Sequence, residues 1–168
     1  KYMLLDSSTR RNLELTETLR EKQKRGSLLW VLDKTRTAMG ARMLRSFIEQ
    51  PLIDKETIEK RLEAVGVLTN DGISREEIRE YLNPIYDLER LLGKISYQTA
   101  NPRDLIALQS SLKMLKPIRM VLEDFKGELL QEIYEEIDPL EDIYHLIESS
   151  IQEEPPILIR EGGIIKDG

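Results

Sequence analysis

Apolar residues recur every three or four positions through most of this 168-residue chain, the period that a half-buried α-helix requires. Between Thr37 and Gln50 the apolar face would carry Met39, Met43, Leu44, Phe47 and Ile48. Thr37 or Thr35 can cap the first turn, because a threonine hydroxyl accepts an otherwise unpaired backbone N–H. Pro51 would end this helix at Gln50. The pattern predicts a mainly α, multi-helix fold.

Further helices should follow with short breaks between them. The expected starts are Asp54, a capping box of Ser74 and Glu77, Asp87, and the pair Asn101-Pro102, with breaks at Asn70-Asp71-Gly72 and Pro84. Two acidic helical segments are expected around 129–137 and 140–151. Residues 28–151 would thus form a helical body.

The longest segment begins at Asn101 and carries a continuous apolar seam, formed by Leu105, Leu108, Leu112, Leu115, Ile118, Leu122 and Phe125. Such spacing is typical of a helix that is packed along its length. Pro117 lies inside it and should kink it, because proline lacks a backbone donor and clashes with the preceding turn.

Both ends of the chain suggest β structure. Short β-prone pieces at 2–5 and 12–15 flank a polar turn, and a charged loop ending at Gly26 completes a first region, residues 1–27. Residues 152–168 carry β-branched residues on both sides of Gly162-Gly163, a pair that favours a tight β-hairpin over 157–165. The chain stops just past this predicted hairpin, which suggests a piece of a longer protein.

Composition excludes several classes of function. The sequence has no cysteine, so thiol catalysis, disulfides and thiolate metal sites are excluded. No apolar stretch reaches the roughly 20 residues of a membrane span and no signal peptide is visible, so we expect a cytoplasmic protein without membrane contact. Residues 1–45 hold 11 Lys/Arg against 5 Asp/Glu, whereas residues 46–168 hold 14 against 26. Most of the chain should therefore repel DNA, while its basic first part could touch a phosphate or two.

No group of residues assembles an active site or a metal site in the sequence. His145 is the only histidine and lies among acids, which favours an ordinary helix residue at or near the surface. The acidic pairs lack loop spacing that would converge oxygens on a cation. The stretch around Gly162 has no following Lys-Ser/Thr and no helix, so it is not a phosphate loop. Trp30 is expected in the core. We predict no catalytic residue, no cofactor and no metal in this chain.

Gly40 stands out because glycine inside a helix costs roughly 1 kcal/mol relative to alanine and usually has a packing reason. We expect a second backbone to approach there. Arg42 and Arg45 on the same helix could pair with carboxylates of the acidic part or of a neighbouring domain. This pattern indicates a helix held between other elements.

Three stretches and their order resemble one known family. "LLDSSTRRNLEL" (4–15), "GSLLWVLDKTRTAMGARMLRSFIEQPL" (26–52) and "PPILIREGGIIKDG" (155–168), with "RLEAVGVL", "DLERLLGKI" and "PRDLIAL" between them, resemble the core or lever domain (the first part of domain III) of the bacterial MutS mismatch-repair family. The resemblance covers essentially the whole chain. Its T-x-T-x-x-G-x-R-x-L-R pattern maps onto Thr35, Thr37, Gly40, Arg42, Leu44 and Arg45, followed by Pro51 and Leu52; Phe47 stands where the family often has tryptophan.

The resemblance implies a structural and interdomain role for these signature residues, in a core that couples ATPase, clamp and mismatch-reading domains. It implies that the full-length protein binds mismatched duplex DNA as a homodimer and hydrolyses ATP with Mg²⁺ in another domain. The mismatch-reading Phe-x-Glu motif and the ATPase phosphate loop are both absent from this sequence. In the family, helices of residues 54–151 pack partly against core helices that return from the clamp, so the resemblance also implies that part of the apolar seam stays exposed to water in this chain. Two alternatives stay open: the MutS-like branch that lacks a mismatch reader, and a free-standing helical scaffold.

Overall fold

The computed structural model describes residues 1–167, which form two compact units: Lys1–Gly66, and the residues from Val67 onward. Over these residues the chain contains ten α-helices and one 3₁₀-helix, and no β-sheet. The boundary between the units falls inside α4 (Lys55–Asn70). In the part of the chain that the structure describes, no helix is long and apolar enough to cross a membrane.

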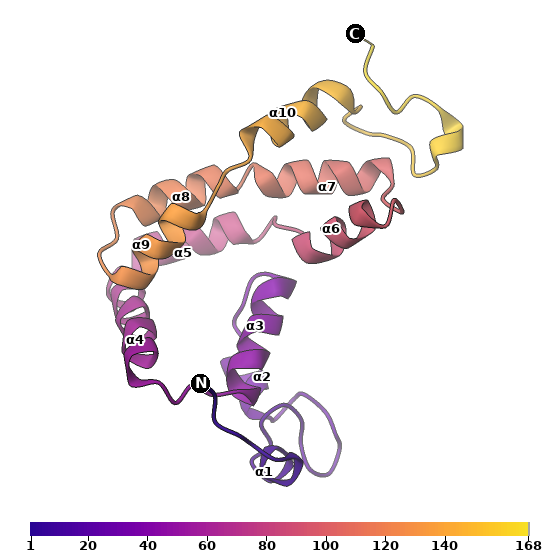
Figure 1. Cartoon of the computed structure of the whole chain (residues 1–168). Coiled ribbons are helices and arrows are strands. Elements are labelled where there is room, and N and C mark those ends of the chain that lie inside the picture. Colours follow the sequence, from indigo (N-terminus) through magenta and orange to yellow (C-terminus); the bar gives the residue numbers. More distant parts are fainter. Residues whose placement is uncertain (168) are drawn as a thin grey trace. The chain divides into compact units, whose positions relative to one another are not determined.

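Unit 1 contains three further helices, α1 (Ser7–Asn12), α2 (Leu28–Leu32) and α3 (Ala38–Glu49) (Figure 1). Its buried side chains are few: Leu15, Leu29 and Ala64, with the hydroxyl of Ser27 fully buried. The backbone N–H groups of Leu28 and Leu29 donate to the carbonyls of Glu14 and Leu15, 3.0 and 2.9 Å away. These bonds fix the start of α2 against the segment that follows α1.

Unit 2 is a layered set of helices: α5 (Gly72–Leu82), α6 (Leu88–Ser96), α7 (Pro102–Leu112), α8 (Leu115–Glu123), α9 (Glu128–Glu136) and α10 (Glu141–Ser150). Helices α7 and α8 follow one another, with α6 and α10 packed on α7 and with α5 and α9 packed on α8 (Figure 1). Leu91, Leu108, Leu112, Ile147 and Ile151 form a buried cluster between α6, α7 and α10. This core is built from leucine and isoleucine spaced by helical turns.

The kink at Pro117 is confirmed, as a break that separates α7 from α8. Helix α7 ends at Leu112 and α8 begins at Leu115. Pro117 has no backbone N–H, so the carbonyl of Lys113, four residues earlier, cannot receive the usual helical hydrogen bond from it. The expectation of an exposed seam is wrong. Leu108, Leu112, Ile118, Leu122 and Phe125 are buried within this chain, and the two other seam residues are half-buried. The helices of unit 2 cover the seam by themselves.

Helix starts that depend on a local cap are mostly confirmed. Thr37 caps α3, Asp87 caps α6, and Asn101 forms a capping box with Asp104 at the start of α7. The predicted capping box of Ser74 and Glu77 is wrong. Helix α5 starts at Gly72, three residues earlier than a Ser74 cap would place it, because Asp71 accepts from the backbone N–H of Ser74 at 3.0 Å and so serves as the cap itself.

The β elements expected near the N-terminus are not formed. The polar stretch expected to be a turn is helix α1, because Asp6 accepts the backbone N–H of Thr9 at 2.6 Å and caps it. Tyr2 makes only an isolated antiparallel bridge to Leu52. A strand needs a partner along its length, and these short pieces have none beyond single contacts among the described residues.

The prediction of a C-terminal hairpin is also wrong, although its turn residues have the expected backbone conformation. Gly162 and Gly163 lie at φ +71° and +65°, in the left-handed region that a tight hairpin turn demands. The residues before them instead form the 3₁₀-helix η1 (Ile159–Glu161), and Pro155-Pro156 supply no N–H donors to a ladder. The chain after the turn pairs with the end of α10, where Ile151 and Ile165 form a bridge. Ile164 packs there against the buried cluster, which anchors this segment to α10 rather than to its own preceding residues.

Candidate functional site: the signature segment of unit 1

The signature segment, which we define as residues 33–52, begins with a hydrogen-bonded turn between α2 and α3. Asp33 Oδ1 accepts the hydroxyl of Thr35 at 2.7 Å and its backbone N–H at 3.2 Å. Asp33 Oδ2 accepts Lys24 Nζ at 2.5 Å. The hydrogen bonds from Lys24 and then from Thr35 lower the pKa of Asp33 to about 2. The ionised carboxylate therefore ties the preceding loop to the turn that leads into α3.

Thr37 and Gly40 continue this arrangement at the start of α3. Thr37 is the N-cap, and its hydroxyl accepts the backbone N–H of Gly40 at 3.0 Å. A Cβ placed on Gly40 would lie 3.1 Å from Thr37 Oγ1 and 3.5 Å from Thr35 Cβ. The expectation of a second backbone beside Gly40 is therefore corrected: the atoms nearest to such a Cβ belong to the side chains of the N-cap Thr37 and of Thr35.

The remaining signature residues lie along α3 and just after it. Leu44 is half-buried, and Arg42 is exposed on the helix surface. Arg45 Nε donates to Glu49 Oε1 at 3.0 Å, four residues later on the same helix. The partner of Arg45 is thus a carboxylate of its own helix, and its expected pairing with a neighbouring domain stays a prediction. At this exposure such a pair contributes only about 0.3–0.5 kcal/mol.

Pro51 and Leu52 pair with the first residues of the chain. The carbonyl of Pro51 accepts the backbone N–H of Met3 at 2.7 Å, and Leu52 forms the bridge to Tyr2. This contact joins the exit of α3 to the N-terminal segment. Gly162 and Gly163 belong to unit 2 and are not part of this arrangement.

Trp30 and Phe47 do not lie in a core. Trp30 is 48% exposed on α2, which makes the expectation of a core tryptophan wrong. Phe47 is 39% exposed, and the guanidinium of Arg61 from α4 stacks over its ring, with Cζ 3.8 Å from the ring centroid. A cation over an aromatic face contributes about 0.5–1 kcal/mol at such a partly exposed position.

Two contributors to this turn were missed at the level of sequence. The first is Asp33, whose D-x-T spacing is the usual signal for an aspartate that accepts from its own downstream backbone. The second is Ser27, fully buried, which caps α2 by accepting the N–H of Trp30 at 3.3 Å and donates to the carbonyl of Lys24 at 2.6 Å. Both residues hold the loop before α2 and the turn after it in one conformation.

The hydrogen bonds of the signature segment fix its backbone. The hydroxyls of Thr35 and Thr37 are engaged in a turn and a helix cap, and the only histidine lies on α10 of unit 2, where it contacts Glu148. Over residues 1–167 no group of three or more His, Cys, Asp or Glu side chains could hold a metal ion. The arrangement can orient α2 and α3 relative to each other.

Comparison with known proteins decides the family. The family model described as MutS domain III matches residues 8–167. The chain belongs to the MutS domain III family. It is 67% identical over 168 residues to the DNA mismatch repair protein MutS of Lachnoclostridium phytofermentans, covering 100% of this chain and 18% of that protein.

Two further MutS proteins give the same result. The chain is 57% identical over 166 residues to MutS of Alkaliphilus oremlandii and 55% identical over 168 residues to MutS of Ruminiclostridium cellulolyticum, each match covering 19% of the relative. It thus spans under a fifth of the length of these curated relatives. The signature segment lies within the region matched to MutS domain III, the core domain of a mismatch-repair protein.

Proposed function

We propose that this domain is a structural core that positions other parts of a longer mismatch-repair protein, so that nucleotide state and grip on DNA are coupled. The observation that carries this proposal is the signature segment. One hydrogen-bonded connection between α2 and α3 uses its threonines, its glycine and Asp33. Lys24 binds to Asp33 and holds the preceding loop to this connection. Elements whose relative position is over-determined in this way can transmit a displacement as rigid bodies.

The activities of the longer protein form the second part of the proposal. We infer that it acts in the cytoplasm, binds mismatched duplex DNA as a homodimer, and hydrolyses ATP with Mg²⁺. The printed name of the relatives, DNA mismatch repair protein MutS, supports a role in mismatch repair. The residues of this domain do not fit ATP and Mg²⁺: the sequence has no G-x-x-x-x-G-K-[ST] loop, and the described residues contain no candidate metal group. We assign nucleotide chemistry to other residues of the longer protein.

The alternative MutS-like branch without a mismatch reader is less favoured. The relatives compared above all carry the MutS name, at 55–67% identity across the full chain. A free-standing scaffold would require the same fold to act without the rest of such proteins, which are more than five times longer than this match.

A domain exchange tests the proposed function. The corresponding 168 residues of the Lachnoclostridium MutS are replaced by this chain, and the hybrid is expressed in bacteria that lack their own MutS. We expect the spontaneous mutation rate to fall to that given by the unaltered Lachnoclostridium protein. A folded hybrid, present at equal abundance, that leaves the rate at the level of the deletion strain would contradict the proposal.

A further inference from the structure

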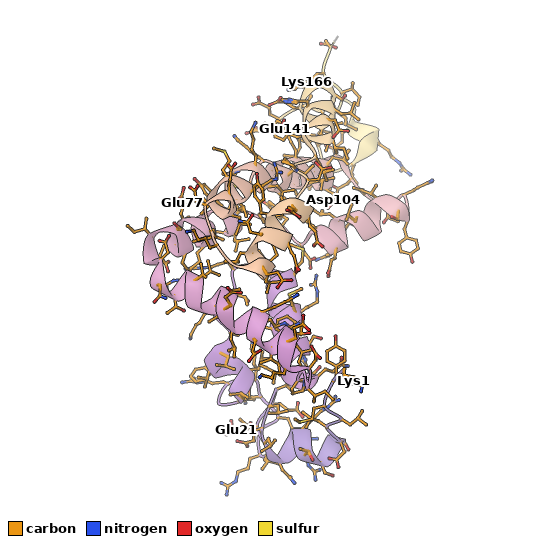
Figure 2. All side chains as sticks on the ribbon, turned by 60° about the vertical axis from the view of Figure 1, so that its left-hand side comes forward. Lys1, Glu21, Glu77, Asp104, Glu141 and Lys166 are labelled. Carbon is orange, nitrogen blue, oxygen red and sulfur yellow. The ribbon has the colours of Figure 1, made fainter. Side chains whose placement is uncertain are left out.

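Unit 1 carries a strongly basic loop between α1 and α2. Its tip, residues 20–25, reads "REKQKR" and holds four Lys/Arg against one Glu, a net charge of +3 in a chain whose net charge is −6. Every one of these six residues is exposed. We call residues 18–26 the basic loop. Figure 2 labels Glu21 on this loop.

The basic loop is closed by its own backbone. The N–H of Thr18 donates to the carbonyl of Gln23 at 2.9 Å, and the N–H of Lys22 donates back to the carbonyl of Thr18 at 3.1 Å. Lys22 lies at φ +49° and Gly26 at φ +93°, so both bends use the left-handed region. A Cβ on Gly26 would lie 3.2 Å from Thr18 Cγ2, which shows that the two ends of the loop touch. A loop held in this way loses little conformational entropy when its side chains bind a partner.

Within residues 1–167, three of the four cations of the loop tip have no hydrogen-bonded or ionic partner. Lys24 is bound to Asp33 in the signature segment. Arg20, Lys22 and Arg25 have no side-chain hydrogen bond or ion pair with any other residue among those that the structure describes. Their charges are available to an external anion.

The basic surface continues onto α1. Arg10 and Arg11 lie in the last turn of α1 and line an open hollow of about 450 Å³ together with Thr16 and Glu17, the two residues that lead into the basic loop. Arg10 Nε donates to the carbonyl of Leu5 at 3.1 Å, which holds its side chain in place. Two cations of α1 therefore lie near the segment that enters the loop, beside the carboxylate of Glu17.

We propose that the basic loop is a contact for the phosphate backbone of duplex DNA, made by Arg20, Lys22 and Arg25. This inference rests on the proposed function for the source of the DNA, and it adds a nucleic-acid contact to a domain that the same proposal treats as framework. Residues 20–25 include no apolar side chain, so the loop lacks the buried anchor that gives protein interfaces most of their affinity. Phosphate is recognised by charge and by guanidinium hydrogen bonds, which this loop does supply.

The test is a fluorescence-anisotropy titration of the 168-residue chain against a labelled 30-base-pair duplex, repeated between 50 and 200 mM salt. Three phosphate contacts predict a slope of log Kobs against log salt of about −2.7. The triple variant R20S/K22S/R25S should weaken binding about tenfold or more at the lowest salt and bring the slope close to zero. Glu21→Gln should strengthen binding, because it removes the one opposing charge of the loop tip.

The matched control is K113S/K126S/R160S, which removes three exposed cations from unit 2 and gives the same net charge of the chain. Circular dichroism confirms that each variant is folded. The proposal stands if only the loop variant loses binding, if a G·T mispair changes nothing, and if Glu21→Gln binds more tightly. Equal loss in both triple variants, a wild-type slope near zero, or tighter binding to polyglutamate than to DNA of equal charge would overturn it.

Failure of this test is distinguishable from failure of the proposed function. The titration concerns phosphate contacts of this chain alone, whereas the domain exchange measures mutation rate in the longer protein. A hybrid that restores repair while the chain shows no salt-dependent binding would remove the basic loop contact and leave the structural role in place.

Discussion

Gly40 gives the sharpest test of how the signature segment is built. The structure places a Cβ on this residue 3.1 Å from Thr37 Oγ1, closer than nearly all real Cβ contacts. That oxygen cannot retreat freely, because it accepts the N–H of Gly40 at 3.0 Å as the cap of α3. Any side chain at position 40 must therefore weaken the cap or shift Thr37.

The size of the effect depends on which side chain is added. Gly40→Ala gains roughly 1 kcal/mol of helix propensity and loses about 0.5–1 kcal/mol of capping, so its free energy of unfolding should stay within about 0.5 kcal/mol of wild type. Gly40→Val adds two methyl groups toward the side chains of Thr35 and Thr37 and has lower helix propensity. We expect it to destabilise unit 1 by about 1–3 kcal/mol.

The assay is urea unfolding followed by tryptophan fluorescence, since Trp30 is the only tryptophan and reports on unit 1. Gly66 is the matched control, because it lies inside α4 and a Cβ there meets no atom within 4 Å. Gly66→Ala should raise the free energy of unfolding by up to about 1 kcal/mol. If Gly40→Val unfolds at the same urea concentration as wild type, or if Gly40→Ala gains as much as Gly66→Ala, the close-packing argument is refuted.

Two other side chains have measurable roles. Because Lys24 and Thr35 depress the pKa of Asp33 to about 2, the stability from this carboxylate is present above pH 4 and lost as the pH falls toward 2. At pH 7, the free energy of unfolding in urea should be about 1 kcal/mol higher for wild type than for Asp33→Asn, a value discounted because Lys24 is half exposed. This difference should close between pH 4 and pH 2. A gap that is unchanged at pH 2 would show that the charge of Asp33 does not matter. Ser111 is fully buried and accepts the backbone N–H of Tyr86 at 3.0 Å. Ser111→Ala should therefore lower the free energy of unfolding of unit 2 by about 1–3 kcal/mol in thermal unfolding. The control Ser110→Ala loses only a hydrogen bond to its own helix and should lower it by less than about 0.5 kcal/mol. Equal losses in the two serine variants would contradict this assignment.

Local signals predicted the helical part of this fold well. Thr37, Asp87 and Asn101 each start a helix as expected, because a cap depends on residues within one turn of itself. The break before Pro117 was predictable for the same reason. Ser74 was misassigned because two possible caps lie three residues apart, and the upstream aspartate competes successfully.

The β elements could not be predicted because a strand depends on a distant partner. Gly162 and Gly163 adopt the turn backbone that their sequence favours, yet Ile165 pairs with Ile151 at the end of α10. Whether the chain after a turn pairs with its own preceding segment or with another element is decided by packing. Here the deciding contact is Ile164 against the buried cluster of unit 2.

The functional role of the signature residues stays a prediction, and the sequence revealed only part of how they pack. The pattern singled out Gly40 as a position of close approach, and the approaching atoms prove to be threonine side chains only three and five residues earlier. Lys24 lies nine residues before Asp33, a spacing that no local motif encodes. Contacts of that kind follow from how the loop closes, and only the structure provides that information.

The most direct measurement of the central claim is ATP hydrolysis by the Lachnoclostridium hybrid with Thr35→Val and Thr37→Val together, with and without mismatched duplex. If the signature segment is framework that couples distant parts, hydrolysis without DNA should stay within about twofold of the parent hybrid, while the change caused by mismatched DNA should shrink about fivefold or more. Hydrolysis that is lost equally with and without DNA would place these threonines in the chemistry itself, and an unchanged response to DNA would show that the segment does not couple anything.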